Sequence, residues 1–422
     1  MRQIPSGWQP VANMFHRLWA LSAILCALLL ASSILAVGDR KNTNGKRAQN
    51  TSALSSLGRE YFVGDQPCAR CHAKIFEAFE RTSHHLTSRT ASRDSILGKF
   101  TTGAAIVRTA NPTLHYEMTA NAGGYFVTAV TGIAPDTSIR TEKFAIVIGS
   151  GKRGQSYLYW KDDELFELPV SYWRDVGWVN SPGYPDGTAF FARPIGPRCL
   201  ECHSSYFHST VELPRKSENS YSTNDFVLGI SCEVCHGPAR AHVEAMTNNS
   251  GNSAVRDIVN PSKLSREREM DACALCHGGA ASRLFSPSFT FVPGAKLSDY
   301  LELQSVDPAT GIDVHGNQTG LLEKSRCYQE SGTQRCRTCH NVHTSQSTES
   351  TYSGSCLGCH DLHACPLYKA RGKRIATQCV GCHMPRQVSS SMVSTTAGQS
   401  ARVTMHNHWI KVYREPDSSE AR

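Results

Sequence analysis

A five-residue pattern, Cys-x-x-Cys-His, occurs seven times in this sequence and constrains its fold more than any other feature. It takes up fourteen of the 17 cysteines. The cysteine pairs are Cys68 and Cys71, Cys199 and Cys202, Cys232 and Cys235, Cys273 and Cys276, Cys336 and Cys339, Cys356 and Cys359, and Cys379 and Cys382. The histidines that follow them are His72, His203, His236, His277, His340, His360 and His383, and we number the copies motif 1 to motif 7 in chain order. So many paired thiols in one chain are expected to be bonded to a covalent cofactor, to a metal or to each other in the folded protein.

The spacing of the motif matches covalent haem attachment. Two thiols three positions apart add to the two vinyl groups of one haem, and the adjacent histidine reaches the iron from the proximal side. Zinc knuckles and disulfides also use paired cysteines, but neither requires a histidine directly after each pair. Histidine makes up 18 of 422 residues, so seven such histidines by chance is a negligible prospect. The sequence therefore predicts seven covalently bound haem c groups and their iron.

Histidines outside the motifs are candidates for the distal side of each iron. His343 lies three residues after His340, on the same face of a helix, and cannot reach the far side of the haem that His340 holds. It is expected to ligate a neighbouring haem, and His242, six residues after His236, follows the same logic. Both positions imply haems in close contact.

Ten histidines beyond His16 lie outside the motifs, and five are favoured as distal ligands: His84, His242, His315, His343 and His408. His84 is preferred to its neighbour His85, and His408 to His406. The less favoured candidates are His115, His208 and His363. Bis-histidine ligation keeps haem potentials low relative to histidine–methionine ligation. Because only about five distal positions are well supported for seven irons, one or two irons are candidates for an open position.

The N-terminal region predicts export. Residues 18–37 contain no charged residue and follow Arg2 and Arg17. A basic start before an apolar stretch is typical of an export signal, and the stretch is long enough to span a bilayer. Residues 1–37 are therefore expected to be a signal peptide or an N-terminal membrane anchor, followed by a flexible linker over 38–57. Either alternative places the remaining chain in the periplasm or on the outer face of the cytoplasmic membrane.

The spacing of the motifs suggests the organisation of the folded part. We expect a first haem-binding segment at 58–100, a β-rich insertion at 101–190, a six-haem region at 191–412 and a polar tail at 413–422. The expected strands of the insertion are Leu114–Thr119, Tyr125–Val130, Phe144–Ile148, Tyr157–Trp160 and Leu165–Val170. Outside it, short helices such as Ile75–Arg81 and Leu264–Cys276 are expected between long loops. The predicted fold class is thus mainly α and haem-dense, with a small antiparallel β insertion.

Aromatic residues gather at the end of the expected insertion, among them Tyr157, Trp173 and Trp178. A hydrophobic core is the favoured explanation for them, and a lining over a haem edge is the alternative.

Three cysteines lie outside the motifs: Cys26 in the apolar N-terminal segment, and Cys327 and Cys365. The last two are either partners in one disulfide or two buried thiols.

The motifs and their surroundings resemble the exported multihaem c-type cytochromes of the cytochrome c-552/c-554 kind. The resemblance rests on Cys68–His72 with Thr82–His85, Gly229–Pro238 with His242, Ser325–Tyr328 before Cys336–His340 with His343, and Cys379–Pro385. It implies haem pairs in stacked and perpendicular contact, bis-histidine irons and electron transfer. It also extends to nitrite reductases and hydroxylamine oxidoreductases. No Cys-x-x-Cys-Lys motif is present in the sequence, which counts against a nitrite reductase of the common pentahaem type.

Two functions follow as expectations. The first is an electron carrier that serves redox partner proteins, either quinol-side or periplasmic donors and acceptors. The alternative is a multihaem oxidoreductase that acts on a small nitrogen or sulfur compound at an iron lacking a distal ligand. The net charge of +8 does not indicate nucleic acid as a partner. Propionates on seven haems would offset most of it, by about −7 in the oxidised state.

Overall fold

The computed structural model describes residues 59–413, apart from 102, 104, 212–216, 249–257, 306–310 and 346–347. The chain divides into two units, Met1–Leu54 and Ser55–Arg422, and every described residue belongs to the second. The predicted export segment, the linker and residues 414–422 of the predicted tail lie outside the described residues. No helix in the described ranges is both long and apolar enough to cross a membrane.

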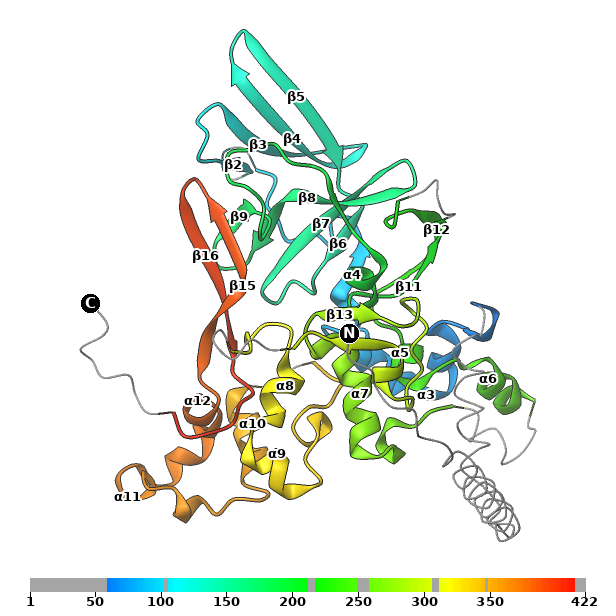
Figure 1. Cartoon of the computed structure of the whole chain (residues 1–422), viewed down its shortest axis with the longest axis vertical. Coiled ribbons are helices and arrows are strands. Elements are labelled where there is room, and N and C mark those ends of the chain that lie inside the picture. The colour runs from blue at the N-terminus through cyan, green and yellow to red at the C-terminus, as the bar shows by residue number, and fades with distance from the viewer. Residues whose placement is uncertain are drawn as a thin grey trace, which may run out of the picture. The chain divides into compact units, whose positions relative to one another are not determined.

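Two antiparallel sheets form the β-rich part of the chain (Figure 1). The six-stranded sheet contains β1 (Ser88–Thr90), β6 (Ile146–Ile148), β7 (Gly154–Lys161), β8 (Glu164–Trp173) and β10 (Arg193–Pro194) in this spatial order, with β9 (Gly177–Asn180) also paired to β8. The four-stranded sheet contains β2 (Ile106–Arg108), β3 (Leu114–Asn121), β4 (Gly124–Ile133) and β5 (Asp136–Lys143) in sequence order. Five of these strands, β3, β4, β6, β7 and β8, overlap the five that were expected, whereas β1, β2, β5, β9 and β10 were not expected.

The largest hydrophobic core lies in this β-rich part. Alternate residues of β3, namely Leu114, Tyr116 and Met118, are buried, as expected for a strand with one covered face. Tyr157, Tyr159 and Trp178 belong to the same core cluster. The indole NH of Trp178 donates to the Lys99 carbonyl at 2.8 Å, so its one polar atom is satisfied. These aromatics are core residues, in agreement with the favoured explanation.

A second core joins the six-stranded sheet to motif 2. Leu200, between the two cysteines of that motif, is buried together with Leu158, Leu165 and Tyr221. Leu200 lies on α4 (Pro197–Glu201), which leads into the hairpin of β11 (Ser204–Ser209) and β12 (Tyr221–Leu228). The β-rich part therefore holds one haem-binding motif directly.

Short helices carry most of the remaining motifs. The α-helices are α3 (Gln66–Phe79), α5 (Cys232–His236), α6 (Arg240–Thr247), α7 (Arg266–His277), α8 (Gln318–Glu323), α9 (Arg326–Ser331), α10 (Glu349–Cys356), α11 (Tyr368–Arg371) and α12 (Cys379–His383). The 3-10 helices include η1 (Arg59–Tyr61), η2 (His85–Thr87), η6 (Cys336–Thr338) and η8 (Gly372–Thr377). Helices α3 and α7 overlap the two that were expected. Buried side chains are few here: the third core cluster consists of Ala274, Leu275, Leu297 and Leu301.

The prediction of a mainly α fold was wrong, because the described residues are about 29% helical and 30% strand. Strands also occur inside the expected six-haem region, as hairpins β11–β12, β13 (Ala281–Leu284) with β14 (Leu301–Leu303), and β15 (Arg386–Thr396) with β16 (Gln399–His406). The turn of the last hairpin has positive φ at both Ala397 and Gly398, 52° and 76°, which is the two-residue turn that suits hairpin twist. Strand β15 also contacts β9, where Ser394 Oγ donates to the Asn180 carbonyl at 2.7 Å.

Candidate haem-binding sites

One helical turn brings the two cysteines of a motif to the same side of the chain. In α5 and α12 the whole motif is a single turn, and in α7 motif 4 forms the last turn. Residues three apart on a helix are neighbours on its surface, so both thiols can face one porphyrin edge. Helix α3 is interrupted at His72, whose φ and ψ are −113° and 34°.

Three pairs of histidine rings have the separation that two axial ligands of one iron require. The ring centres are 6.1 Å apart for His236 and His343, 6.3 Å for His340 and His408, and 6.1 Å for His84 and His277. Metal–nitrogen bonds of about 2 Å place imidazole centres on opposite sides of one metal about 6 Å apart. Each pair joins a motif histidine to a histidine that was favoured as distal. The residues present therefore fit bis-histidine haems at motifs 3, 4 and 5.

Hydrogen bonds at Nδ1 orient several of these rings. His236 Nδ1 bonds the Val259 carbonyl at 2.8 Å, and His383 Nδ1 bonds the Lys411 carbonyl at 2.9 Å. A carbonyl accepts only from a protonated Nδ1, so the lone pair of Nε2 is left for a metal. His408 Nδ1 bonds the His406 carbonyl at 3.1 Å in the same way.

Burial and neighbouring histidines keep the imidazoles of His84 and His408 neutral. Burial, followed by the charges of His277 and His340, lowers the pKa of His84 to about 4. Burial also lowers the pKa of His408 to about 4, with a further contribution from His340. Neutral imidazole is the form that binds iron, so the chain holds these ligands ready at neutral pH.

His203 and His315 form a fourth association. Burial lowers the pKa of His203 to about 4, and His315 is the neighbouring group with the largest electrostatic effect on it. His203 Nδ1 lies 3.1 Å from Thr87 Oγ1. His315 thus lies close enough to motif 2 to be considered for its haem.

A carboxylate anchors the loop that carries His315. The ladder between β15 and β16 is irregular between Val388 and Val393, which releases backbone NH groups. Asp313 accepts from Ser390 N at 3.1 Å and from Ser391 N at 2.9 Å. It also accepts from the hydroxyls of Ser389, at 2.9 Å, and Ser391. The loop is therefore fixed to the hairpin two residues before His315.

Other buried carboxylates tie neighbouring motifs together. Glu233, inside motif 3, accepts from Val63 N at 3.0 Å, Gly64 N at 2.8 Å and Ala239 N at 3.0 Å. These bonds hold the chain entering motif 1 against motif 3. Such long-range carboxylate contacts were not anticipated, because a glutamate inside the motif gives no signal of its distant partner.

Glu269 on α7, the helix that carries motif 4, joins this helix to motif 5 in a similar way. Its carboxylate pairs with Arg335 Nη1 at 2.9 Å and with Arg337 Nε at 2.9 Å. The two arginines flank Cys336, whose sulfur lies 3.7 Å from the sulfur of Met270. The glutamate side chain is 6% exposed, so the arginines neutralise a buried charge.

The cysteines of different motifs also lie close together. The thiols of Cys68 and Cys232, of Cys202 and Cys276, and of Cys273 and Cys336 lie close enough to shift each other's pKa values. Electrostatic interactions further join Cys235 to Cys273, Cys339 to Cys359, and Cys356 to Cys379. All seven motifs thus belong to one continuous set, in which motif 4 is next to motifs 2, 3 and 5.

The remaining predicted ligands lie as follows. His242 is half-buried on α6, which packs against η1 just before motif 1. His406 is engaged at both nitrogens, with the Met384 carbonyl at 2.7 Å and Glu349 Oε1 at 2.9 Å, which distinguishes it from His408.

The less favoured histidines have carboxylate neighbours. His115 lies 3.1 Å from Glu117, His208 lies 3.3 Å from Asp225, and His363 lies 2.9 Å from Asp361. His85 Nδ1 is 3.8 Å from Asp65. None of these four histidines belongs to the ring pairs described above.

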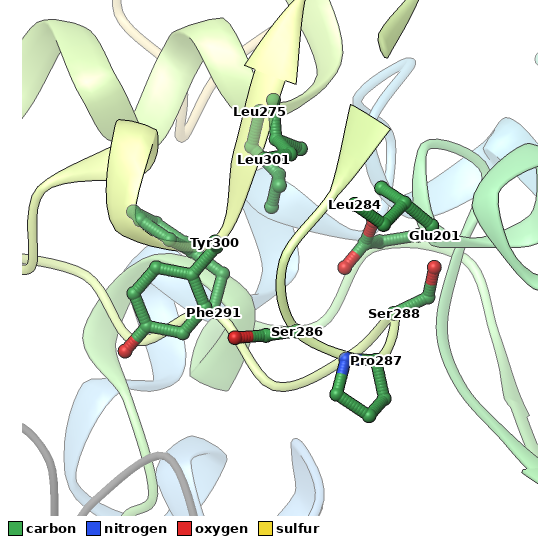
Figure 2. A pocket seen from close by; sticks show the side chains of 9 residues that line it. All are labelled: Glu201, Leu275, Leu284, Ser286, Pro287, Ser288, Phe291, Tyr300 and Leu301. Atoms are coloured by element: carbon green, nitrogen blue, oxygen red, sulfur yellow. The ribbon is translucent and has the colours of Figure 1, made fainter. Parts of the chain in front are cut away.

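A small pocket of about 10 Å³ lies between motifs 2 and 4 (Figure 2). Phe291 and Tyr300 line one side, and Glu201 and Ser288 line the other (Figure 2). The Glu201 carboxylate is engaged by Arg198 Nη1 at 2.7 Å and Phe289 N at 2.6 Å. The pocket is smaller than usual ligand pockets, and its one carboxylate has a structural role.

Cysteine and histidine do not form direct metal clusters in the described part of the chain, where no group of three or more His, Cys, Asp or Glu is arranged around a metal position. Cys327 and Cys365 are both free thiols in the structure, so the disulfide alternative is not formed. The described cysteines are thus available for the thioether chemistry that the motifs predict.

The seven motifs and the histidine pairs beside them fit the covalent haem sites of a c-type cytochrome. Residues 192–237, which contain motifs 2 and 3, match the family described as cytochrome c554 and c-prime. The recognition of a c-type cytochrome family is confirmed.

Among solved structures, the chain is similar to the one titled "Crystal Structure of Outer Cell Wall Cytochrome OcwA". The TM-score is 0.52 at 16% identity, over 83% of this chain and 80% of that chain. At this identity the likeness shows the fold alone. No curated protein matches the chain.

The ion pairs of Glu269 with Arg335 and Arg337, which we call the Glu269 clamp, lead to a stability prediction. Glu269→Gln leaves Arg335 and Arg337 without their counter-charge. It is expected to lower the free energy of unfolding of the haem-loaded protein by about 1–3 kcal/mol, measured by denaturant titration. Glu330→Gln is the control, because its pair with Arg326 at 2.8 Å is exposed, and a change within about 0.5 kcal/mol is expected. Equal losses in the two variants would contradict the clamp.

The Asp313 anchor leads to a pH prediction. Burial alone would raise the pKa of Asp313, but bonds from Ser391, Ser389 and the backbone outweigh it and lower the pKa to about 2. The ionised carboxylate therefore contributes stability that is present above its ordinary pKa of 3.8 and is lost as pH falls towards 2.

Asp313→Asn should accordingly lower the free energy of unfolding by about 1 kcal/mol at neutral pH. The difference from the unaltered chain should shrink as pH falls through 3 to 2, followed by denaturant titration at each pH. The exposed Asp136 of β5 supplies the control, since Asp136→Asn should show no such pH-dependent difference. A pH-independent difference for Asp313→Asn would refute the anchor.

Proposed function

We propose that the chain is an exported seven-haem c-type cytochrome that carries electrons through closely packed, mostly bis-histidine haems. The observation that carries the proposal is the interlocking of the ring pairs. His84, from the segment of motif 1, pairs with His277 of motif 4. His343, just after motif 5, pairs with His236 of motif 3. The segments of motifs 1 and 5 would thus each supply a ligand to another site, which requires neighbouring haems.

The contacts support a ligand assignment for five haems. The proposed pairs of proximal and distal ligands are His72 with His242, His203 with His315, His236 with His343, His277 with His84, and His340 with His408. His242 is assigned to motif 1 because α6 packs beside the entry to that motif. The other four rest on the ring separations and on the electrostatic contact of His203 with His315.

The chain's own residues determine what such a protein can do. Haem c, when bound, supplies an iron that takes up and releases one electron. The fold holds neutral imidazoles on both sides of a site, which favours low potentials. It also holds all seven motifs in one continuous set through buried carboxylates and adjacent cysteines. This arrangement suits transfer between sites better than chemistry at one of them.

Export and redox partners complete the proposal. The apolar segment at 18–37, after Arg2 and Arg17, supports export as a cleaved signal or a retained anchor. The similar solved structure is titled an outer cell wall cytochrome, and an exported location agrees with that title. The partners we propose are electron donors and acceptors on the quinol side or in the periplasm.

A second candidate function rests on motifs 6 and 7. In the described ranges, no histidine ring pair includes His360 or His383. An iron with an open position would therefore be sought at these motifs. A multihaem oxidoreductase acting on a small nitrogen or sulfur compound would use such an iron.

Haem counting and electron paramagnetic resonance of the oxidised protein test the proposal. A pyridine haemochrome assay should give seven haems per chain, and another number would overturn the haem assignment. Spin quantitation should find low-spin ferric signals for the haems. A high-spin, cyanide-sensitive haem would instead favour the second candidate function.

The two histidines near the C-terminus provide a matched pair of variants. His408→Ala should convert one haem per chain from low spin to high spin, because His340 loses the ring opposite it. His406→Ala should leave every haem low-spin, since His406 bonds the Met384 carbonyl and Glu349 instead. Resonance spectra of both variants, at equal haem content, measure this. A spin change in His406→Ala alone would reverse the assignment.

A further inference from the structure

Charge is distributed very unevenly along the folded chain. Residues 59–361 contain 29 lysines and arginines against 32 aspartates and glutamates. Residues 362–413, which we call the basic segment, contain seven lysines and arginines and no acidic residue. The seven are Lys369, Arg371, Lys373, Arg374, Arg386, Arg402 and Lys411. The modest net charge of the chain therefore conceals a strongly positive region.

The cations of the basic segment are accessible and are not neutralised by the protein. All except the half-buried Lys411 are exposed. Within the described ranges, the ion pairs involve other residues and include none of these seven. The nearest polar contacts are uncharged, such as Arg371 Nη1 with Gln378 Oε1 at 3.3 Å. The positive charge is thus available to an external partner.

The basic segment surrounds the last two haem-binding motifs. Lys369 and Arg371 lie on α11, and Lys373 and Arg374 lie on η8, between motif 6 and motif 7. Figure 1 shows α11 at the lower left end of the helical part, and η8 contacts both α11 and α12. The carbonyl of Lys411 bonds His383 Nδ1 of motif 7 at 2.9 Å. Propionates of seven haems would be spread over all seven motifs, so they do not remove this local excess.

Aromatic and apolar side chains are mixed with the cations. Lys411 Nζ lies 3.5 Å from the centre of the Trp409 ring and 4.9 Å from that of Tyr413. Leu367, Val388 and Val412 are 42%, 55% and 76% exposed. Arginine, aromatic and apolar residues together are typical of protein–protein interfaces, whereas a polyanion or a lipid surface needs the cations alone.

We propose that the basic segment is the docking surface for an acidic redox protein that exchanges electrons with the chain at motifs 6 and 7. The inference rests on the proposed function and adds the kind of partner and its place. In each encounter one electron leaves the reduced centre of the partner and converts one ferric iron to ferrous, with no bond made or broken. Opposite charges speed such encounters at low ionic strength and select the partner.

A reduced plant-type [2Fe–2S] ferredoxin, an acidic one-electron carrier, is the probe for stopped-flow reduction of the full haem-loaded chain. The variant K369Q/R371Q/K373Q/R374Q removes four cations of the basic segment. K99Q/K143Q/K152Q/K161Q is the matched control, because it removes four exposed cations from the β-rich part. The second-order rate constant is measured at low ionic strength and at about 0.15 M, where charges are screened.

The unaltered chain should react faster at low than at high ionic strength. The basic-segment variant should lose on the order of tenfold in rate at low ionic strength, and the control less than about twofold. Equal losses in both variants, or a rate independent of ionic strength, would overturn the docking surface. Binding to phosphatidylglycerol vesicles that depends on the four cations, with unchanged ferredoxin rates, would overturn it in favour of a lipid surface.

A reductive titration with dithionite separates this inference from the proposed function. If all haems of the unaltered chain take up electrons but ferredoxin shows no charge dependence, the docking surface fails and the electron carrier stands. If the haems do not take up electrons, the proposed function fails with it. Equal haem content and equal titration curves for the two variants exclude misfolding as the cause of a slower rate.

Discussion

The pairing of histidines from different motif segments is the interaction on which the rest of the structure depends. A motif fastens its own haem locally, within one helical turn, but the opposite ring comes from elsewhere in the chain. His84 faces His277, and His408 faces His340, across long stretches of sequence. With haem bound as proposed, these sites would act as cross-links, which would explain how a region with only small clusters of buried side chains keeps a defined fold.

Buried carboxylates support these cross-links from the protein side. Glu233 holds the chain before motif 1, Glu269 holds the two arginines of motif 5, and Asp313 holds the loop of His315. A buried carboxylate is costly unless its partners are complete, so Glu233 and Glu269 tolerate few alternative arrangements, whereas Asp313 is half-buried. Distances between ligands are thereby fixed by polar contacts where apolar packing is scarce.

How much the sequence could predict depends on the range of the interaction. The seven motifs and the ranking of the remaining histidines can be predicted from local spacing. The prediction that His343 serves a neighbouring site uses helix geometry alone. The hairpin β15–β16 was missed because its serine and threonine residues lack a clear alternation of apolar and polar positions. The carboxylate clamps and the order of motifs in space join residues far apart, for which a single sequence carries no signal.

Net charge illustrates the same difference between composition and arrangement. The value of +8 first suggests an anionic partner, and haem propionates then argue against it. The structure resolves the contradiction, because charge acts over about a Debye length of 8–10 Å and each surface is therefore sensed separately. A chain whose total charge would be nearly cancelled by seven haems still concentrates positive charge on α11 and η8 and on the last hairpin. Since electron exchange requires a partner to approach a haem, the local charge beside the last motifs matters more for encounter than the total.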